Sequence, residues 1–130
     1  MVLVDTTVWI DFFSGQSFPH VRIFENLILN RGNICICGVI TTEILQGIKN
    51  DNEFKKIQDL LKNLIFLPAS YHTYLYSAQI YRELRKKGIT IRKTIDCIIA
   101  AIAIEHNIQL LHNDKDFVSI ERYFSLQVIK

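Results

Sequence analysis

Four acidic residues stand at points where a predicted strand ends or a predicted helix begins. Asp5 follows the apolar run of residues 1–4, and Asp114 follows the run IQLLHN. Glu43 falls in the first turn of the predicted helix TTEILQGIKN, and Asp96 opens the predicted helix TIDCIIAAIAIEH. Because ligands of open parallel sheets bind beyond the carboxyl ends of the strands, we expect these four side chains to converge at one edge.

Four carboxylates in one concave site need a counter-charge, because like charges raise one another's pKa. A divalent cation supplies that charge, and oxygen ligands favour Mg²⁺ or Mn²⁺ over zinc. Such ions hold phosphates and lower the pKa of a bound water. A lone acid at a helix or strand end is more often a cap, but the set of four favours a metal site. We expect Asp5, Asp96 and Asp114 to bind the metal, with Glu43 as a further ligand or a water-orienting base.

The segments that carry these acids alternate between strands and helices. Strands are expected at residues 1–4, 33–40, 64–67, 108–113 and 125–129, and helices at 7–13, 20–30, 41–50, 51–63, 71–87, 94–106 and 117–123. This alternation predicts one domain over residues 1–130, an α/β sandwich with a largely parallel sheet. Thr6 or Thr7, Thr41 or Thr42, and Thr94 stand where a hydroxyl could cap a helix.

Composition agrees with a globular protein. The 130 residues are 49% hydrophobic and 22% charged, which argues against disorder. No apolar run is long enough to span a bilayer. Asp5 and Asp11 interrupt the first apolar run, so we expect no signal peptide. The three cysteines are an odd number, and we expect them to be reduced thiols of a cytoplasmic protein.

Basic residues outnumber acids once the four site carboxylates are set apart. The net charge is +2, but nine remaining acids face fifteen Lys and Arg, a formal charge of +6. An acidic pocket in a basic surface suits an enzyme that acts on a polyanion. Five basic residues on the segment leading to Asp96 are candidates for phosphate contacts: Arg85, Lys86, Lys87, Arg92 and Lys93. A solvated helix end is an equally good interpretation of this segment.

The segments VLVDTTVWIDFF, TTEILQGI, TIDCIIAAIAIEH and LLHNDKDF resemble, in order and spacing, those of PIN-domain proteins of the VapC type, the toxin ribonucleases of bacterial toxin–antitoxin pairs. The resemblance covers nearly the whole chain. It implies a PIN-like three-layer α/β/α sandwich with a mostly parallel central sheet. It also implies Mg²⁺- or Mn²⁺-dependent endoribonuclease activity on transfer RNA or another structured RNA, with Asp5, Glu43, Asp96 and Asp114 as the acidic cluster. A homodimer and a small VapB-type antitoxin are the implied partners.

Three further positions follow from the same resemblance. Thr6 matches a small hydroxyl residue beside the first acid, and Asp116 matches an acid found in many relatives. Many relatives carry Thr or Ser two positions before the last acid, where this chain has His112. We expect a structural role for His112 in preference to a proton shuttle or a phosphate contact. An exposed part of the aromatic cluster around Phe13 would suit an antitoxin segment.

Two other functions fit parts of the pattern. A phosphatase of the haloacid-dehalogenase type also ends its first strand in a reactive Asp, but it usually needs a second acid two residues later, where this chain has Thr7. The other alternative is a non-catalytic PIN-like regulatory module that binds metal or RNA without cutting it.

Overall fold

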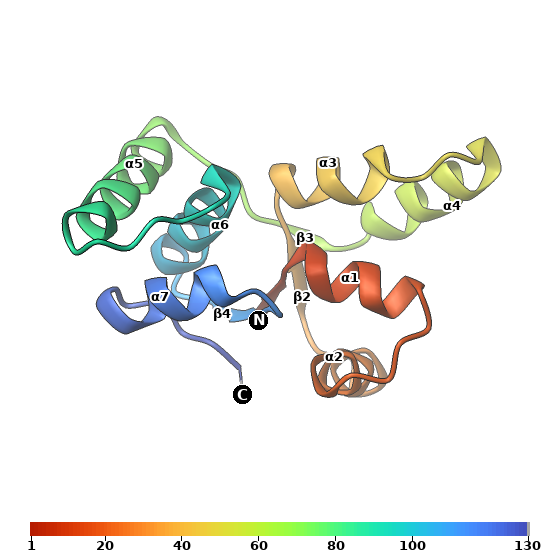
Figure 1. Cartoon of the computed structure of the whole chain (residues 1–130). Coiled ribbons are helices and arrows are strands. Elements are labelled where there is room, and N and C mark those ends of the chain that lie inside the picture. Colours follow the sequence, from red (N-terminus) through yellow and green to blue (C-terminus); the bar gives the residue numbers. More distant parts are fainter. Residues whose placement is uncertain (130) are drawn as a thin grey trace.

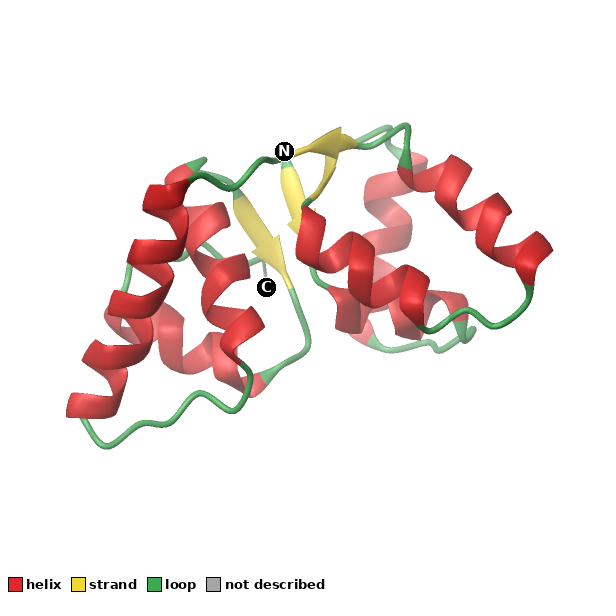
Figure 2. Ribbon diagram, turned by 90° about the horizontal axis from the view of Figure 1, so that it is seen from above, coloured by secondary structure: helices red, strands yellow, loops and turns green. Residues whose placement is uncertain are grey.

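Four parallel strands form the centre of the molecule, and the helices lie in two groups on either side of them (Figures 1 and 2). The structure is a computed structural model, and it describes residues 1–129. In chain order the elements are β1 (Val2–Val4), α1 (Thr6–Phe13), α2 (Pro19–Leu29), β2 (Ile34–Ile36), α3 (Gly38–Gln46), α4 (Asp51–Leu61), β3 (Ile65–Phe66), α5 (Tyr71–Lys86), α6 (Thr94–Glu105), β4 (Gln109–Leu111) and α7 (Lys115–Tyr123). The predicted α/β sandwich with a mostly parallel sheet is confirmed.

The strand order β3-β2-β1-β4 places β1 between β2 and β4. In register, Val2 pairs with Ile34 of β2 and with Gln109 of β4. The chain adds β2 and β3 on one side of β1 and returns to place β4 on the other side. The ends of β1 and β4 therefore flank the point where the order reverses, which is where open α/β sheets bind ligands.

The sheet is buried on both faces, as the unbroken apolar runs of its strands predict. Leu3 and Val4 of β1 and Leu110 of β4 have no exposed surface. Helix α6 packs against α5 and α7, and its small side chains Ala100 and Ala103 are fully buried. Small residues let α6 approach its neighbours closely, so the start of this helix is held firmly relative to the sheet.

Helix α3 begins earlier than its sequence suggests, and the prediction that Glu43 lies in its first turn is wrong. The run Gly38–Ile40, predicted as strand, is the first turn of the helix, with Cys37 as the cap residue. Ile40 and Ile44, four residues apart, are both buried, and this helical spacing overrides the β propensity of the run. The hydroxyl of Thr41 donates to the carbonyl of Cys37 within the helix, so it is not a cap.

Two other helices are also capped differently from the prediction. The side chain of Asp5, not of Thr6 or Thr7, caps α1 by accepting the Thr7 N–H. At α6 the cap residue is Lys93, without a capping side-chain hydrogen bond, and Thr94 is the first helical residue. An acid that both ends β1 and caps α1 keeps its carboxylate at the sheet edge.

A glycine ends α5 and returns the chain towards the site. Gly88 has φ +78°, and the N–H groups of Gly88 and Ile89 donate to the carbonyls of Arg85 and Leu84. This Schellman arrangement needs a left-handed residue, which glycine adopts without a Cβ clash. Residues 89–93 then lead directly into α6.

The predicted strand at residues 125–129 is reduced to a single parallel bridge between Val128 and Leu110 at the outer edge of β4. The Leu110 N–H donates to the carbonyl of Gln127, and the Ile129 N–H donates to the carbonyl of Leu110. No helix in residues 1–129 is both long and apolar enough to cross a membrane.

Candidate active site

Three aspartates meet near the carboxyl end of β4. Asp96 lies in the first turn of α6, Asp114 caps α7, and Asp116 lies in the first turn of α7. One oxygen of each lies within 4.8 Å of the other two. We refer to Asp96, Asp114 and Asp116 as the acidic triad. The sequence prediction grouped Asp96 with Asp114, and Asp116, predicted as peripheral, completes the group.

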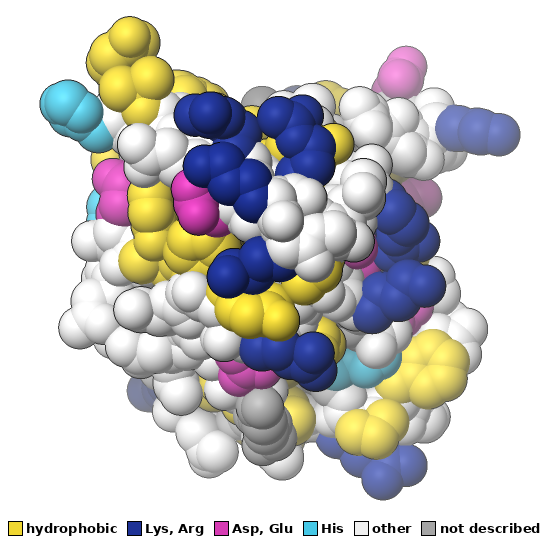
Figure 3. Space-filling model, turned by 60° about the vertical axis from the view of Figure 1, so that its left-hand side comes forward, with side chains coloured by type: hydrophobic (Ala, Val, Ile, Leu, Met, Phe, Trp, Pro, Cys, Tyr) yellow, Lys and Arg dark blue, Asp and Glu magenta, His cyan; other side chains and the backbone are white. Residues whose placement is uncertain are grey.

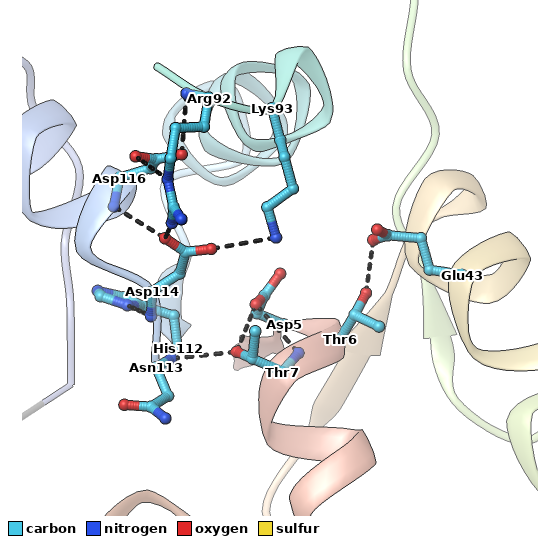
Figure 4. Close-up of polar contacts among 10 residues, drawn as sticks. All are labelled: Asp5, Thr6, Thr7, Glu43, Arg92, Lys93, His112, Asn113, Asp114 and Asp116. Carbon is cyan, nitrogen blue, oxygen red and sulfur yellow. Dashed lines mark hydrogen bonds and ion pairs between the residues drawn. The ribbon is translucent and has the colours of Figure 1, made fainter. Parts of the chain in front are cut away.

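Asp5 faces the triad from the end of β1 and is held by Thr7 (Figure 4). It is only 3% exposed, and its Oδ2 accepts the Thr7 hydroxyl at 2.6 Å and the Thr7 N–H at 3.2 Å. The Thr7 hydroxyl also accepts the Asn113 N–H at 3.1 Å, and the Asp5 N–H donates to the Leu111 carbonyl at 2.9 Å. Thr7 therefore couples the first acid to the loop that carries Asp114.

Glu43 stands on the other side of Asp5 and contacts Thr6 (Figure 4). The Thr6 hydroxyl donates to Oε1 of Glu43 at 2.7 Å. This bond joins α1 to α3 and orients the carboxylate in the second turn of α3. The structure therefore brings Glu43 to Asp5 through Thr6, but not into the triad.

His112 supports the loop before Asp114. Its Nδ1 accepts the Asp114 N–H at 3.1 Å, which places the ring proton of neutral His112 on Nε2. The ring also packs against Phe117, with ring centres 4.9 Å apart. These contacts agree with the structural role expected from the sequence.

Arg92 and Lys93 reach the acids with their charged ends, although both side chains remain about half exposed (Figure 4). Lys93 Nζ lies 3.2 Å from Oδ2 of Asp114, and an Arg92 guanidinium nitrogen lies 3.1 Å from Oδ1. Arg92 Nε also lies 3.5 Å from Asp116, whose other oxygen accepts the Arg92 N–H at 3.2 Å. We call Arg92 and Lys93 the cationic pair.

Burial and charge shift the pKa of Asp96 strongly. It is 4% exposed, and burial, followed by the charge of Asp114, raises its pKa to about 7 against the opposing charge of Lys93. Its Oδ2 is fully enclosed and has no hydrogen-bond partner among the described residues. Because a buried carboxylate oxygen without a partner is costly, this atom is suited to bind a cation or to carry a proton.

The pKa values of Asp5, Asp114 and Lys93 are also shifted by burial and by their charged neighbours. Burial raises the pKa of Asp5, and the Glu43 carboxylate adds to this effect against the hydrogen bonds from Thr7. Burial also acts to raise the pKa of Asp114, but the Asp116 N–H and the cationic pair lower it by more, so it lies below its ordinary value. Burial acts to lower the pKa of Lys93, and the carboxylates of Asp114, Asp96 and Asp5 raise it by more.

The donor set fits a hard divalent cation. All the anionic groups are carboxylates, three of them close enough to share one ion, and Oδ2 of Asp96 is buried without a hydrogen-bond partner within residues 1–129. Oxygen donors in such a group are typical of Mg²⁺ and Mn²⁺ sites. The site can therefore hold a divalent cation, and Asp5 is close enough for its charge to act on Asp96.

Sequence reasoning missed two features of this site. Thr7 binds Asp5 and the loop before Asp114, although Thr6 was the predicted hydroxyl. Arg92 and Lys93 were candidates for phosphate contacts or for a solvated helix end, and neither interpretation included their contacts with Asp114 and Asp116. The concentration of charged residues between positions 92 and 96 is the sequence signal that could have indicated the contacts of Arg92 and Lys93 with acids.

Basic side chains gather over the face that α5 presents, interleaved with hydrophobic ones (Figure 3). Arg85, Lys86 and Lys87 at the end of α5 are exposed. Arg85 lies over the Tyr81 ring at 5.6 Å, and Lys86 pairs with Glu83 at 3.2 Å. A solvated cationic surface of this kind can contact a polyanion.

Comparisons with known proteins place this geometry in a family. The model of the PIN domain family matches residues 2–123. Ribonuclease VapC11 of Mycobacterium tuberculosis is 35% identical over 129 residues, which cover 98% of this chain and 96% of that protein.

Solved structures of toxin–antitoxin complexes share the fold. VapBC2 from Rickettsia felis, solved bound to a DNA fragment from its promoter, matches with a TM-score of 0.76 and 22% identity over 99% of this chain and 98% of that one. VapBC-1 from nontypeable Haemophilus influenzae matches with a TM-score of 0.77 and 21% identity over 100% of this chain and 98% of that one. The family match, the close relative and the shared fold lead to one conclusion: this chain belongs to the PIN-domain family.

Proposed function

We propose that this chain is a VapC-type endoribonuclease, the toxin of a toxin–antitoxin pair, which hydrolyses phosphodiester bonds of a structured RNA such as transfer RNA. The observation that carries the proposal is the acidic triad at the point where the strand order reverses, with a buried oxygen on Asp96 that has no hydrogen-bond partner in the described part of the chain. The 35% identity to a named ribonuclease over nearly the whole chain supports the same activity.

The proposed cation is Mg²⁺ or Mn²⁺, held by Asp96 and Asp114 with Asp5 and Asp116 beside them. When bound, such an ion polarises the phosphodiester and lowers the pKa of an attacking water. Asp5 is kept in place by the two Thr7 hydrogen bonds and need not reorganise during the reaction. Glu43, oriented by Thr6, is placed to position the water for in-line attack on phosphorus or to complete the acidic cluster.

The direct test is cleavage of purified transfer RNA by the wild type, Asp114→Asn and Asp59→Asn. Asp59 is an exposed acid on α4 and serves as a matched control. With Mg²⁺ or Mn²⁺, we expect the wild type and the control to cleave the RNA and Asp114→Asn to lose at least about 100-fold of this activity. In EDTA we expect no cleavage by any of the three proteins. Equal cleavage by Asp114→Asn, or cleavage that survives EDTA, would refute the assignment.

The exposed end of α5 is the proposed RNA track, because Arg85, Lys86 and Lys87 are oriented to solvent whereas the cationic pair contacts acids. Replacing Lys86 and Lys87 by Ala should weaken RNA binding and reduce its dependence on salt concentration. Replacing Lys55 and Lys56 on the exposed face of α4 is the control. An unchanged salt dependence in the Lys86 and Lys87 variant would contradict the track.

The proposed antitoxin site is a groove of about 240 Å³ between α1, α3 and α4. Its apolar lining includes Ile10, Phe13 and Ile57, and Glu43 and Glu53 add negative charge. An antitoxin segment with apolar side chains and a basic residue is complementary to this lining. Phe13→Asp should weaken binding of the cognate antitoxin, and Leu29→Asp, at an exposed apolar position of α2, should not. Equal binding by both variants would place the antitoxin elsewhere.

The proposed homodimer surface lies around β3 and the start of α5. Exposed apolar side chains concentrate there: Ile65, Phe66, Tyr71, Tyr74 and Leu75. An exposed patch of this kind favours association with another chain. Phe66→Lys should convert the protein to a monomer in light scattering, whereas Leu29→Lys should leave its mass unchanged. A dimeric Phe66→Lys protein would exclude this surface.

The two other functions are not favoured. The phosphatase would require a second acid at position 7, and Thr7 there is a hydrogen-bond donor to Asp5. The non-catalytic module is disfavoured because all four predicted acids are present and three carboxylates are gathered for a cation.

A further inference from the structure

The cationic pair contacts two of the acids that would hold the proposed metal. Oδ1 of Asp114 accepts both the Asp116 N–H at 2.9 Å and an Arg92 nitrogen at 3.1 Å. Oδ2 of Asp114 has one ion-pair partner within residues 1–129, which is Lys93 Nζ at 3.2 Å. Lys93 therefore occupies the Asp114 oxygen that Arg92 and the Asp116 N–H leave open.

Lys93 reaches this oxygen from the residue that caps α6, three positions before Asp96. Its ammonium group is attracted by Asp96 and Asp5 as well as by Asp114. The side chain is about half exposed, and Asp114 is almost enclosed. A long, half-exposed side chain can leave its partner at modest cost, because partly solvated ion pairs are weak.

We infer that Lys93 is an internal counter-ion of the acidic site, which occupies the metal position on Asp114 and must move away before a divalent cation binds. The inference rests on the proposed metal site. It assigns Lys93 a positioning role: the ammonium keeps the carboxylates together before the metal arrives, and it lowers the affinity of the site for the metal. Arg92 remains on Oδ1 of Asp114 and on Asp116, so the carboxylates stay oriented after Lys93 leaves.

The test is the affinity of the metal-free protein for Mn²⁺, measured by calorimetry on the full chain at fixed pH and ionic strength. Lys93→Met keeps the length of the side chain and removes its charge. Lys93→Arg retains the charge, and Lys115→Met removes a charge from an exposed residue next to Asp114 in the chain.

We expect Lys93→Met to bind Mn²⁺ about five- to tenfold more tightly than the wild type, because it need not displace an ion pair. Lys93→Arg and Lys115→Met should stay within about twofold of the wild type, because neither uncovers Oδ2 of Asp114. An affinity of Lys93→Met equal to or weaker than that of the wild type would overturn the inference.

Thermal unfolding provides a second readout that does not depend on turnover. Metal-free Lys93→Met should unfold at a lower temperature than the wild type, because its carboxylates lose their counter-ion, and saturating Mn²⁺ should raise its Tm by more. An unchanged Tm of the metal-free variant would contradict the counter-ion role. Absence of Mn²⁺ binding and of RNA cleavage in the wild type would refute the proposed function itself, whereas wild-type binding without a gain in Lys93→Met refutes the role of Lys93 alone.

Discussion

The buried carboxylate of Asp96 makes the stability of the metal-free protein dependent on pH, and Asp96→Asn should remove that dependence. Burial and the charge of Asp114 raise the pKa of Asp96 from 3.8 to about 7 in the folded protein. The folded state therefore binds this proton more tightly than the unfolded state does between these two values. The stability that this proton contributes is fully present below about pH 3.8, falls as the pH rises from there, and is lost once the pH passes about 7.

The size of the effect follows from the shift. One pKa unit corresponds to about 1.4 kcal/mol, so the shift from 3.8 to about 7 should cost the folded state roughly 4 kcal/mol above pH 7. Asp96→Asn has the shape of the protonated acid and does not ionise. We expect it to be more stable than the wild type at pH 8 by about this amount or somewhat more, with the difference shrinking towards pH 4.

The assay is urea unfolding in EDTA from pH 4 to 8 of the wild type, Asp96→Asn and Asp59→Asn. The exposed acid Asp59 controls for the loss of a charge, and its substitution should leave the pH dependence unchanged. Addition of Mn²⁺ should stabilise the wild type at pH 8 and leave Asp96→Asn nearly unaffected. A parallel pH dependence of the wild type and Asp96→Asn would show that Asp96 ionises normally. Its buried oxygen would then need neither a cation nor a proton.

Three further predictions follow from single contacts. Thr7→Val should reduce RNA cleavage about 10- to 100-fold and stability by only about 1 kcal/mol, because it removes the hydroxyl that holds Asp5; unchanged kinetics would deny Thr7 that role. Gly88→Ala should lower the free energy of unfolding by about 1–2 kcal/mol, because Gly88 has φ +78°, which an L side chain rarely adopts. An added Cβ would meet open space, so the cost is conformational and not a clash. Equal urea midpoints of the variant and the wild type would contradict this prediction. The thiols of Cys37 and Cys97 are buried, which raises their pKa to about 11, so a thiol reagent at pH 8 should modify them only after unfolding; rapid reaction of the native protein would show that they are accessible.

Much of the site could be predicted because its acids are tied to local structure. Asp5 ends an unbroken apolar strand, and Asp114 follows another, so parallel pairing alone brings them to one edge. Asp96 is recognisable in the first turn of a helix whose apolar and alanine content requires burial. These inferences need only the periodicity of apolar side chains along helices and strands and the parallel direction of the strands.

Helix starts were less predictable, because competing local signals have similar strength. The β-branched residues Val39 and Ile40 favour a strand, yet they lie in the first turn of α3 because Ile40 and Ile44 are buried on one helical face. The shift moved Glu43 into the second turn and turned Thr41 from a predicted cap into a residue within the helix. Tertiary packing decided between two local alternatives.

The sequence by itself determined an α/β domain with carboxylates at the ends of its parallel strands, since hydrophobic period and strand order along the chain require both. Only the tertiary structure decided which side chains touch. Thr7 meets Asn113 across 106 positions, and Lys93 lies on Asp114. Such contacts depend on the register of β1 against β4 and on how α6 packs beside β4. A shift of a few ångströms in either would separate hydrogen-bonded groups, while the hydrophobic pattern that predicts the fold would be unchanged.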